Sequence, residues 1–317
     1  MRLRRKAING VFRSWARINH HLEVFRRASA GVEVIRNIDY GPYLYNRLDI
    51  YRPEFAARPL PVMLYIHGGG FVLCSKETHR GLAQAHAVHG GYLVFNIDYR
   101  LAPRFRFPAA HEDACTAYRW VAENCARFGG DPARIVVAGE SAGGNLALAV
   151  GVAASYRRPE KWAQAVYDAP VRPLAIQPIM PYLQVSNPAR HSFSNSAGVF
   201  SLGVAHDLAT AYLGPGRTQA ASATLMADPI RVLEECGAPQ RPFPAMWAGV
   251  GTNDLCHDDV RRLEAVCERL SIPATFRYYE NEVHAFHALR WRAAAKRFWA
   301  DSFEFLGAQA APVAVQS

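Results

Sequence analysis

One serine of the chain stands in a setting that would make its hydroxyl a nucleophile. The stretch "IVVAGESAGGN" (135–145) passes from apolar residues into a serine between small residues, and the helix-like run "NLALAVGVAA" continues from it. Glycines at 139 and 143 fit a sharp turn in which a Cβ would clash with a neighbouring strand or helix. A serine at such a strand-to-helix turn lies close to the positive end of the helix dipole. We therefore predict that Ser141 is a nucleophile.

A nucleophilic serine needs a base and a group that orients the base, and two later segments supply them. Asp254 in "AGVGTNDLCHDD" follows one strand-like run, and His284 in "RYYENEVHAFHAL" follows the next. Residues that follow parallel strands meet at one edge of the sheet, so this order predicts a triad of Ser141, Asp254 and His284. Two alternatives lie nearby in the sequence, Asp258 for the acid and His287 for the base.

The segment "YIHGGGFV" supplies candidate donors for a developing negative charge. His67 and Gly68 begin the motif, and Gly69 and Gly70 complete it after a strand-like run. Consecutive glycines let backbone N–H groups approach a carbonyl oxygen, which is how an oxyanion hole is made. A glycine run alone is only a flexible turn, but its position after a strand and behind a histidine favours the oxyanion function.

Strand-like and helix-like segments alternate after residue 40. The expected strands span 43–51, 61–67, 92–98, 135–139, 173–179, 244–250 and 274–279, and the expected helices span 107–127, 141–156, 257–270 and 289–305. Such alternation is typical of an α/β fold with a mostly parallel central sheet and helices on both faces. The first strand or two could be antiparallel.

Together these motifs resemble the hormone-sensitive-lipase-like carboxylesterases of the α/β-hydrolase fold. The resemblance covers about residues 45–305 and depends on "HGGGF" (67–71), "DYRLAPRFRFPAA" (98–110), "GESAGGN" (139–145), the acid at 254 and "HAF" (284–286). It implies Ser141 as nucleophile, His284 as general base and then acid, and Asp254 as the group that orients the imidazole. The implied oxyanion donors are the backbone N–H groups of Gly69, Gly70 and Ala142.

The resemblance also implies a helical cap over the site. Family members build the cap from an N-terminal segment and from an insertion after the sixth strand, which correspond here to residues 1–40 and about 185–225. Residues 41–306 would then form the catalytic domain and 307–317 a flexible tail. The implied activity is hydrolysis of short- to medium-chain acyl esters through an acyl-enzyme, with no cofactor and no metal.

The chain departs from the family pattern at four positions. Glu140 stands where Asp is usual, and Cys256 ends a triplet that is usually "DPL". Arg104 replaces an acidic residue after "LAP", and Ala285 replaces a glycine. We expect Glu140 to alter the hydrogen bonds around the nucleophile, and an ion pair at Arg104 to be lost or reversed.

Two other functions remain open for the same scaffold. A deacetylase or amidase that acts on a small metabolite would use the same triad. A non-catalytic small-ligand binding protein, like the plant gibberellin receptors that resemble this family, would lack the catalytic histidine. The presence of His284 favours an enzyme, because the chemistry of the triad needs all of its parts.

Positive charge is concentrated at the N-terminus. The formal net charge is +9, and the first 36 residues account for +7 of it. Apolar residues recur there at three- and four-residue steps, at Ile8, Val11, Phe12, Trp15, Ile18, Leu22 and Phe25, which predicts an amphipathic helix. We favour packing of its apolar face on the rest of the protein. Weak peripheral contact with an anionic membrane is the alternative, and no nucleic-acid partner is expected.

The remaining composition indicates a soluble protein of a reducing compartment. The six cysteines form no CxxC pair, so free thiols are expected. Arg13 and Arg17 interrupt any apolar run after the basic start "MRLRRK", and no run approaches the roughly 20 apolar residues of a transmembrane helix. We expect a cytoplasmic protein with no integral membrane segment and a small-molecule ester as its substrate. The sequence leaves a homodimer open.

Overall fold

The computed structural model describes residues 31–54, 59–190, 202–215 and 222–310. The expected N-terminal amphipathic helix lies outside these residues, and so does the segment 191–201 in the expected cap insertion. The last seven residues, 311–317, also lie outside them.

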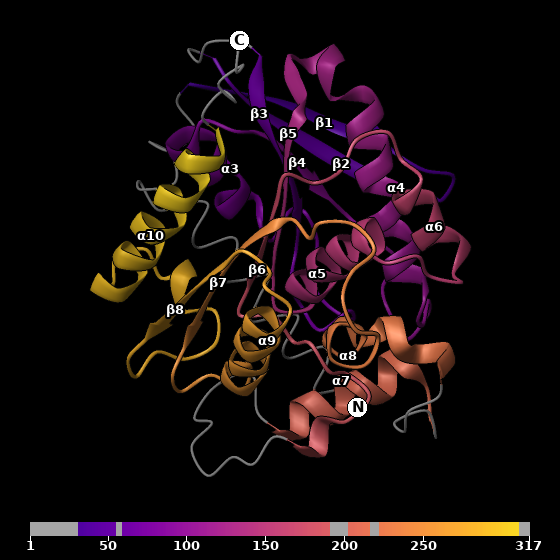
Figure 1. The fold of residues 1–317 in the computed structure, drawn as a ribbon. Helices are drawn as coiled ribbons and strands as arrows, with labels where there is room; N and C mark the ends of the chain where they lie inside the picture. The colour runs from indigo at the N-terminus through magenta and orange to yellow at the C-terminus, as the bar shows by residue number, and fades with distance from the viewer. Residues whose placement is uncertain (1–30, 55–58, 191–201, 216–221, 311–317) are drawn as a thin grey trace.

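An eight-stranded sheet forms the centre of the described structure (Figure 1). Its strands are β1 (Val32–Asp39), β2 (Arg47–Pro53), β3 (Leu60–Ile66), β4 (Leu93–Ile97), β5 (Gly130–Glu140), β6 (Ala175–Ile179), β7 (Ala245–Gly251) and β8 (Ala274–Tyr279), in the order β1-β2-β4-β3-β5-β6-β7-β8. The two ladders that β2 forms, with β1 and β4, are antiparallel, and the others are parallel. This confirms the predicted sheet, including the antiparallel start.

Helices cover both faces of the sheet. They are α3 (Arg80–Gly90), α4 (Ala109–Asn124), α5 (Ala142–Ser155), α6 (Lys161–Tyr167), α7 (Leu202–Leu213), α8 (Pro229–Glu235), α9 (His257–Arg269) and α10 (Ala293–Ala310), with short 3₁₀ turns η1 (Cys125–Phe128), η2 (Pro188–Arg190), η3 (Ser222–Ala227) and η4 (Phe286–Ala288). In Figure 1, α3 and α10 lie on one face, and α4, α5 and α6 lie together on the other. The predicted α/β fold with helices on both faces is therefore confirmed.

The structure corrects the expected boundaries at both ends of the catalytic domain. Residues 32–39, assigned to the cap from the sequence, form the edge strand β1 of the sheet. Most of β1 is exposed or half-buried and it carries charged residues, so it lacks the apolar pattern that marks the other strands. At the other end, α10 continues to Ala310, into the expected tail.

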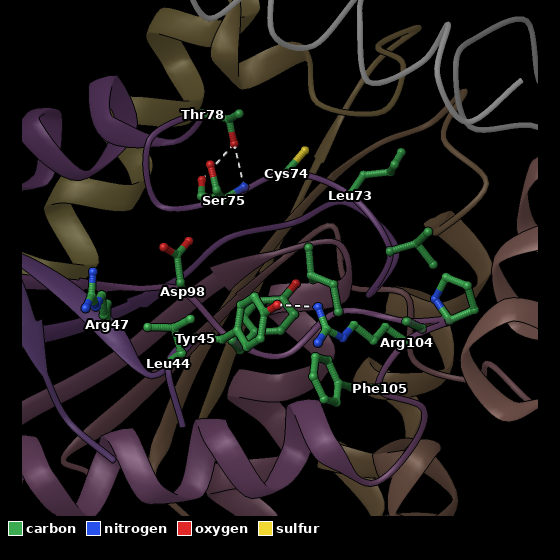
Figure 2. Close-up of a pocket in the computed structure, with 15 residues that line it drawn as sticks. Leu44, Tyr45, Arg47, Leu73, Cys74, Ser75, Thr78, Asp98, Arg104 and Phe105 are labelled. Atoms are coloured by element: carbon green, nitrogen blue, oxygen red, sulfur yellow. Dashed lines mark hydrogen bonds between the residues drawn. The ribbon is translucent and has the colours of Figure 1, made fainter. Parts of the chain in front are cut away.

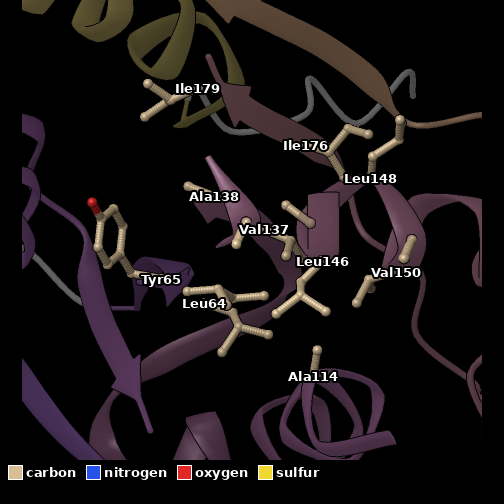
Figure 3. Close-up of a cluster of buried hydrophobic side chains, with 14 of the residues drawn as sticks. Leu64, Tyr65, Ala114, Val137, Ala138, Leu146, Leu148, Val150, Ile176 and Ile179 are labelled. Carbon is tan, nitrogen blue, oxygen red and sulfur yellow. The ribbon is translucent and has the colours of Figure 1, made fainter. Parts of the chain in front are cut away.

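The main core lies between the central strands and the helices α4 and α5 (Figure 3). Leu64 of β3 and Val137 of β5 face Leu146 of α5, with Ala114 of α4 closing the cluster. Every residue of α5 is buried, which explains why its sequence is apolar on all sides. Packing on every side holds α5 rigidly, and with it the residue that precedes its first turn.

Candidate active site

Ser141 occupies the turn between the end of β5 and the start of α5. Its φ of 54° and ψ of −116° lie in a region that costs a non-glycine residue about 1–3 kcal/mol. A Cβ on Gly143 would lie 2.0 Å from Ile66 O, and a Cβ on Gly139 would lie 2.4 Å from Gly143 O. The predicted requirement for glycine on both sides of the serine is confirmed. The tight packing of this turn holds the strained serine in place.

The backbone of Ser141 is anchored by hydrogen bonds, and its hydroxyl does not cap the helix. The Ser141 N–H donates to Ile179 O at 2.9 Å, and Ser141 O accepts from the N–H groups of Asn145 at 3.0 Å and Tyr182 at 3.1 Å. A serine before a helix usually caps it with its side chain, but the Ser141 hydroxyl makes no such hydrogen bond. The cap position thus holds a rigid serine whose Oγ is not used to stabilise the helix.

Asp254, which follows β7, is paired with His284, which follows β8. His284 Nδ1 lies 2.8 Å from Asp254 Oδ2 and 2.9 Å from Oδ1. An ionised carboxylate only accepts hydrogen bonds, so Nδ1 carries the proton and Nε2 is the basic nitrogen of the neutral ring. Burial lowers the pKa of His284, but the charges of Asp254 and Glu140 and the hydrogen bond to Asp254 outweigh it, so the pKa is raised.

The two alternatives considered for acid and base have other partners. Asp258 lies in the first turn of α9, half-exposed, with its carboxylate 3.6 Å from His257 Nδ1. His287 is fully buried, and its Nε2 lies 2.8 Å from Glu140 Oε2. The structure therefore brings together Asp254 and His284, and it does not bring Asp258 or His287 into that pair.

The glycine loop that follows β3 presents unpaired backbone donors. Gly69 has φ 109° and Gly70 has φ 61°, conformations that favour glycine. Gly69 O fixes the loop by accepting from the N–H groups of Val72 and Leu73 at 3.1 and 2.9 Å. Within the part of the chain that the structure describes, the N–H groups of Gly69, Gly70 and Ala142 donate no hydrogen bond. Three donors are thus available on the two segments that flank Ser141.

His67, the first residue of the glycine motif, is buried and hydrogen-bonded within the protein. Its Nδ1 lies 2.7 Å from Gly68 O, and its own carbonyl accepts a hydrogen bond from the Tyr99 hydroxyl at 3.0 Å. Burial lowers the pKa of His67 to about 3, so the ring is neutral at neutral pH and Nδ1–H donates to Gly68 O. His67 therefore supports the loop and offers no basic group to a substrate.

The structure shows the surroundings of two departures from the family pattern. Arg104 donates to the Tyr45 hydroxyl at 2.7 Å and lies 5.2 Å from the centre of the Phe105 ring. Arg104, where we expected an ion pair to be lost or reversed, thus contacts two aromatic side chains. Ala285 has φ 62°, a left-handed conformation that glycine adopts without strain, and its N–H points at Met180 Sδ at 3.0 Å.

The acid–base pair and its neighbour Cys256 have the ligand types of a metal site, with ligand atoms within 4.8 Å of one another. Burial and the nearby charge of Asp254 raise the pKa of the Cys256 thiol well above its usual value. His284 Nδ1 donates to Asp254, and the raised pKa keeps the Cys256 thiol protonated, so a metal could bind the sulfur only by displacing that proton. The arrangement suits an oriented base better than a cation.

A cavity of about 620 Å³ lies beside the glycine loop (Figure 2). Val72–Ser75 and Thr78 form one wall, and Tyr45 and Phe105 form an aromatic side with Arg104 between them. Asp98 also lines the cavity, and burial raises its pKa to about 6. None of Ser141, Asp254 and His284 lines this cavity.

Helix α7, from the expected cap insertion, packs directly on the glycine loop. A Cβ on Gly70 would lie 2.3 Å from the Leu208 side chain, and the Tyr212 ring stacks on Phe71 with centroids 4.1 Å apart. The Tyr212 hydroxyl is fixed in turn by His111 Nδ1 at 2.7 Å. The described part of the insertion therefore covers one side of the site.

The sequence of this chain places it in the α/β-hydrolase fold family, whose profile matches residues 63–288. Over 97 residues it is 50% identical to carboxylesterase NlhH of Mycobacterium tuberculosis, a stretch that spans 31% of this chain and only 30% of that protein. Over 104 residues it is 40% identical to hormone-sensitive lipase of Bos taurus, covering 33% of this chain and 14% of the lipase. The predicted resemblance to the hormone-sensitive-lipase-like branch is confirmed.

The structural comparison extends over nearly the whole chain. A bacterial heroin esterase matches with a TM-score of 0.81 over 96% of this chain and 91% of its own. The two sequences are 20% identical, so this likeness shows the fold alone. Among the helices of the described residues, none has the length and apolar character needed to cross a membrane.

Proposed function

We propose that the protein is a serine carboxylesterase that hydrolyses short- to medium-chain acyl esters. The observation that carries the proposal is the strained Ser141 at the start of α5, on the same sheet edge as the Asp254–His284 pair. β5, β7 and β8 run parallel within one sheet, so the residues that follow them share its carboxyl edge. The names of the curated relatives, a carboxylesterase and a lipase, support an ester substrate.

The proposed reaction has two halves that share one base. His284 Nε2 takes the proton of Ser141 Oγ as Oγ attacks the ester carbonyl, and the N–H groups of Gly69, Gly70 and Ala142 bind the oxyanion. The imidazolium returns its proton to the leaving alcohol, which yields an acyl-enzyme. Water, deprotonated by the same nitrogen, then releases the acid. Asp254 holds the Nδ1 proton throughout and stabilises the imidazolium.

The test is hydrolysis of p-nitrophenyl esters from acetate to palmitate by wild type and Ser141→Ala. We expect activity to peak at short or medium chains and to fall by about three orders of magnitude or more in Ser141→Ala. Ser155→Ala, a buried serine at the other end of α5, is the matched control and should keep wild-type activity. A Ser141→Ala rate within tenfold of wild type would contradict the proposal. Matched p-nitroanilides compare esterase with amidase activity.

The basic N-terminal segment carries a separate proposal, that it makes weak peripheral contact with anionic lipid. Its +7 charge within 36 residues supports this. Full-length protein and a variant without residues 1–30 would be mixed with phosphatidylserine vesicles at low and high salt. Absence of binding at low salt would contradict the contact. A cytoplasmic location and a homodimer are also proposals, to be tested by cell fractionation and analytical ultracentrifugation.

A further inference from the structure

Glu140, directly before Ser141, has a buried carboxylate that the triad mechanism does not use. Its Oε1 lies 2.8 Å from His79 Nε2 in a hydrogen bond. Its Oε2 lies 2.8 Å from His287 Nε2, a close electrostatic contact without the alignment of a hydrogen bond. One side chain at the nucleophile thus joins two histidines that are far apart in the sequence.

The His79 side of this bridge supports the glycine loop. His79 directly precedes α3, and its Nδ1 lies 2.8 Å from Thr78 Oγ1, which fixes the ring. The Gly68 N lies 3.4 Å from His79 Nε2, a packing contact, because the proton on Nε2 is donated to the Glu140 carboxylate. Gly68 also packs on the carboxylate itself, because a Cβ there would lie 2.8 Å from Glu140 Oε1. Glu140 and His79 therefore hold Gly68, the residue directly before the proposed oxyanion donors Gly69 and Gly70.

The His287 side supports the loop that carries the base. His287 lies in η4, three residues after His284, and is fully buried. Its ring centroid is 5.1 Å from that of Phe298, and its carbonyl accepts a hydrogen bond from the Trp299 indole at 3.0 Å. The turn after His284 is therefore fixed to α10 on one side and faces Glu140 on the other.

We propose that Glu140 is a positioning residue for the reaction: its carboxylate holds the oxyanion loop through His79 and the His284 loop through His287, on either side of Ser141. The inference rests on the proposed ester hydrolysis by Ser141 and His284. Positioning at this level matters because a misplacement of about 1 Å can cost about 100-fold in rate.

The charge of Glu140 provides a second way to detect this function. Burial raises the pKa of Glu140, but His79 and His287 outweigh burial and hold it well below the usual value, so the carboxylate is ionised at neutral pH. This anion and Asp254 both raise the pKa of His284, which also has the buried Cys256 thiol as a neighbour. The other titratable groups that face Glu140 are Tyr65, His67, Cys74 and Tyr99.

Those four groups are neutral at neutral pH, so they do not obscure the effect. Burial raises the pKa of both tyrosines and of the Cys74 thiol, and it lowers the pKa of His67 to about 3. Removal of the Glu140 charge should therefore lower the pKa of His284. Since the base must be neutral to act, the acid limb of the pH–rate profile should move to lower pH.

The experiment compares Glu140→Gln, which keeps the shape and removes the charge, with Glu282→Gln. Glu282 is a matched control: it is buried, lies two residues before His284, and pairs with Arg292 at 2.9 Å. The pKa of His284 would be measured by NMR on full-length protein with ¹³C-labelled histidine, with the signal assigned by its loss in His284→Gln. Values of kcat and KM for p-nitrophenyl acetate would be measured across pH.

We expect Glu140→Gln to lower the pKa of His284, to shift the acid limb with it, and to reduce plateau kcat about 10- to 100-fold with KM changed less than about threefold. Glu140→Asp retains the charge and should bring the acid limb back towards wild type. Glu282→Gln should leave the His284 pKa unchanged. An unchanged His284 pKa and kcat in Glu140→Gln, or equal changes in Glu282→Gln, would overturn the proposal.

The NMR titration separates this proposal from the proposed function. Wild type without ester hydrolysis would reject the esterase, while the His284 pKa in Glu140→Gln would still test the coupling directly. If Glu140→Gln fails to fold, His287→Asn removes one contact alone. It should lower kcat at constant KM, and an unchanged kcat would count against the bridge.

Discussion

In the proposed mechanism, Asp254 determines which nitrogen of His284 acts as the base. The carboxylate accepts the Nδ1 proton in a buried site, so the neutral ring presents Nε2, and its charge raises the pKa of the imidazole. A raised pKa has a cost, because more of the ring is protonated and inactive at mildly acidic pH. The benefit is a more basic nitrogen once the ring is neutral.

The pH dependence of kcat/KM should therefore show an acid limb above the ordinary histidine pKa of about 6.5, with activity rising as pH rises. Asp254→Asn removes the charge, so the limb should move to lower pH, and the plateau should fall by about 10⁴-fold. Asp258→Asn is the matched control and should leave both unchanged. Loss of activity in Asp258→Asn with retention in Asp254→Asn would reverse the assignment.

At the scale of the elements, the candidate site lies on loops that follow strands. The backbones of these loops include residues with positive φ. The left-handed glycines after β3 leave N–H groups unpaired, and the left-handed Ala285 after β8 turns the chain directly beyond the base. In the loop after β3, a side chain at a glycine position would clash with its neighbours. In the loop after β8, a glycine at position 285 would relieve the backbone strain. Two substitutions test these effects in opposite directions.

Gly69→Val should reduce kcat about 100- to 1,000-fold, the effect of losing an oxyanion donor. A Cβ at Gly69 would lie 2.3 Å from Leu73 O, so the loop must shift. Gly307→Val in α10 is the matched control, because a Cβ there would meet nothing within 4 Å. This variant should keep the kcat of wild type. Normal turnover of Gly69→Val in steady-state assays would show that this loop does not bind the oxyanion.

Ala285→Gly should stabilise the protein by about 0.5–1 kcal/mol. A left-handed conformation costs alanine about 1–2 kcal/mol, while glycine adds back part of this as chain entropy in the unfolded state. Ala300→Gly, at an exposed position inside α10, should instead destabilise by about 1 kcal/mol. The midpoints of urea unfolding at constant m measure both. Destabilisation in both variants would argue against strain at Ala285.

At the scale of the whole molecule, the buried side chain of Arg100 connects three segments near the carboxyl edge of the sheet. Arg100, after β4, uses its backbone N–H and its guanidinium on Asp113 of α4, at 2.7 and 3.0 Å. The same guanidinium donates to Ala109 O and lies 3.9 Å from the centre of the Tyr43 ring, in the loop before β2. A strand end, a helix start and a distant loop thus share one charged group.

Asp113→Ala should destabilise the protein by about 3 kcal/mol, because it removes the buried partner of Arg100 and leaves only the half-exposed Glu112 carboxylate, 2.7 Å away. Glu123→Ala removes an exposed ion pair with Arg119 on the same helix and should cost less than about 1 kcal/mol. Urea unfolding of the two variants gives the comparison directly. Equal losses would mean that Glu112 alone compensates the charge of Arg100 when Asp113 is absent.

Local patterns were sufficient to predict most of the fold. All seven expected strands and all four expected helices overlap elements of the structure, because alternation and apolar runs are properties of neighbouring residues. The glycines around Ser141 were predictable for the same reason, since the turn and its residues are contiguous. β1 was not predicted from the sequence, because an edge strand with few buried side chains has little apolar pattern.

The sequence by itself thus determined the α/β architecture, the strained serine turn and the residue types of the proposed triad. Only the tertiary structure decided that Asp254 rather than Asp258 faces His284, and that Glu140 faces both His79 and His287. The physical reason is that a buried charge is stable only beside groups that compensate it. Those groups come from segments far apart in the chain, and only the folded sheet brings them within hydrogen-bond distance.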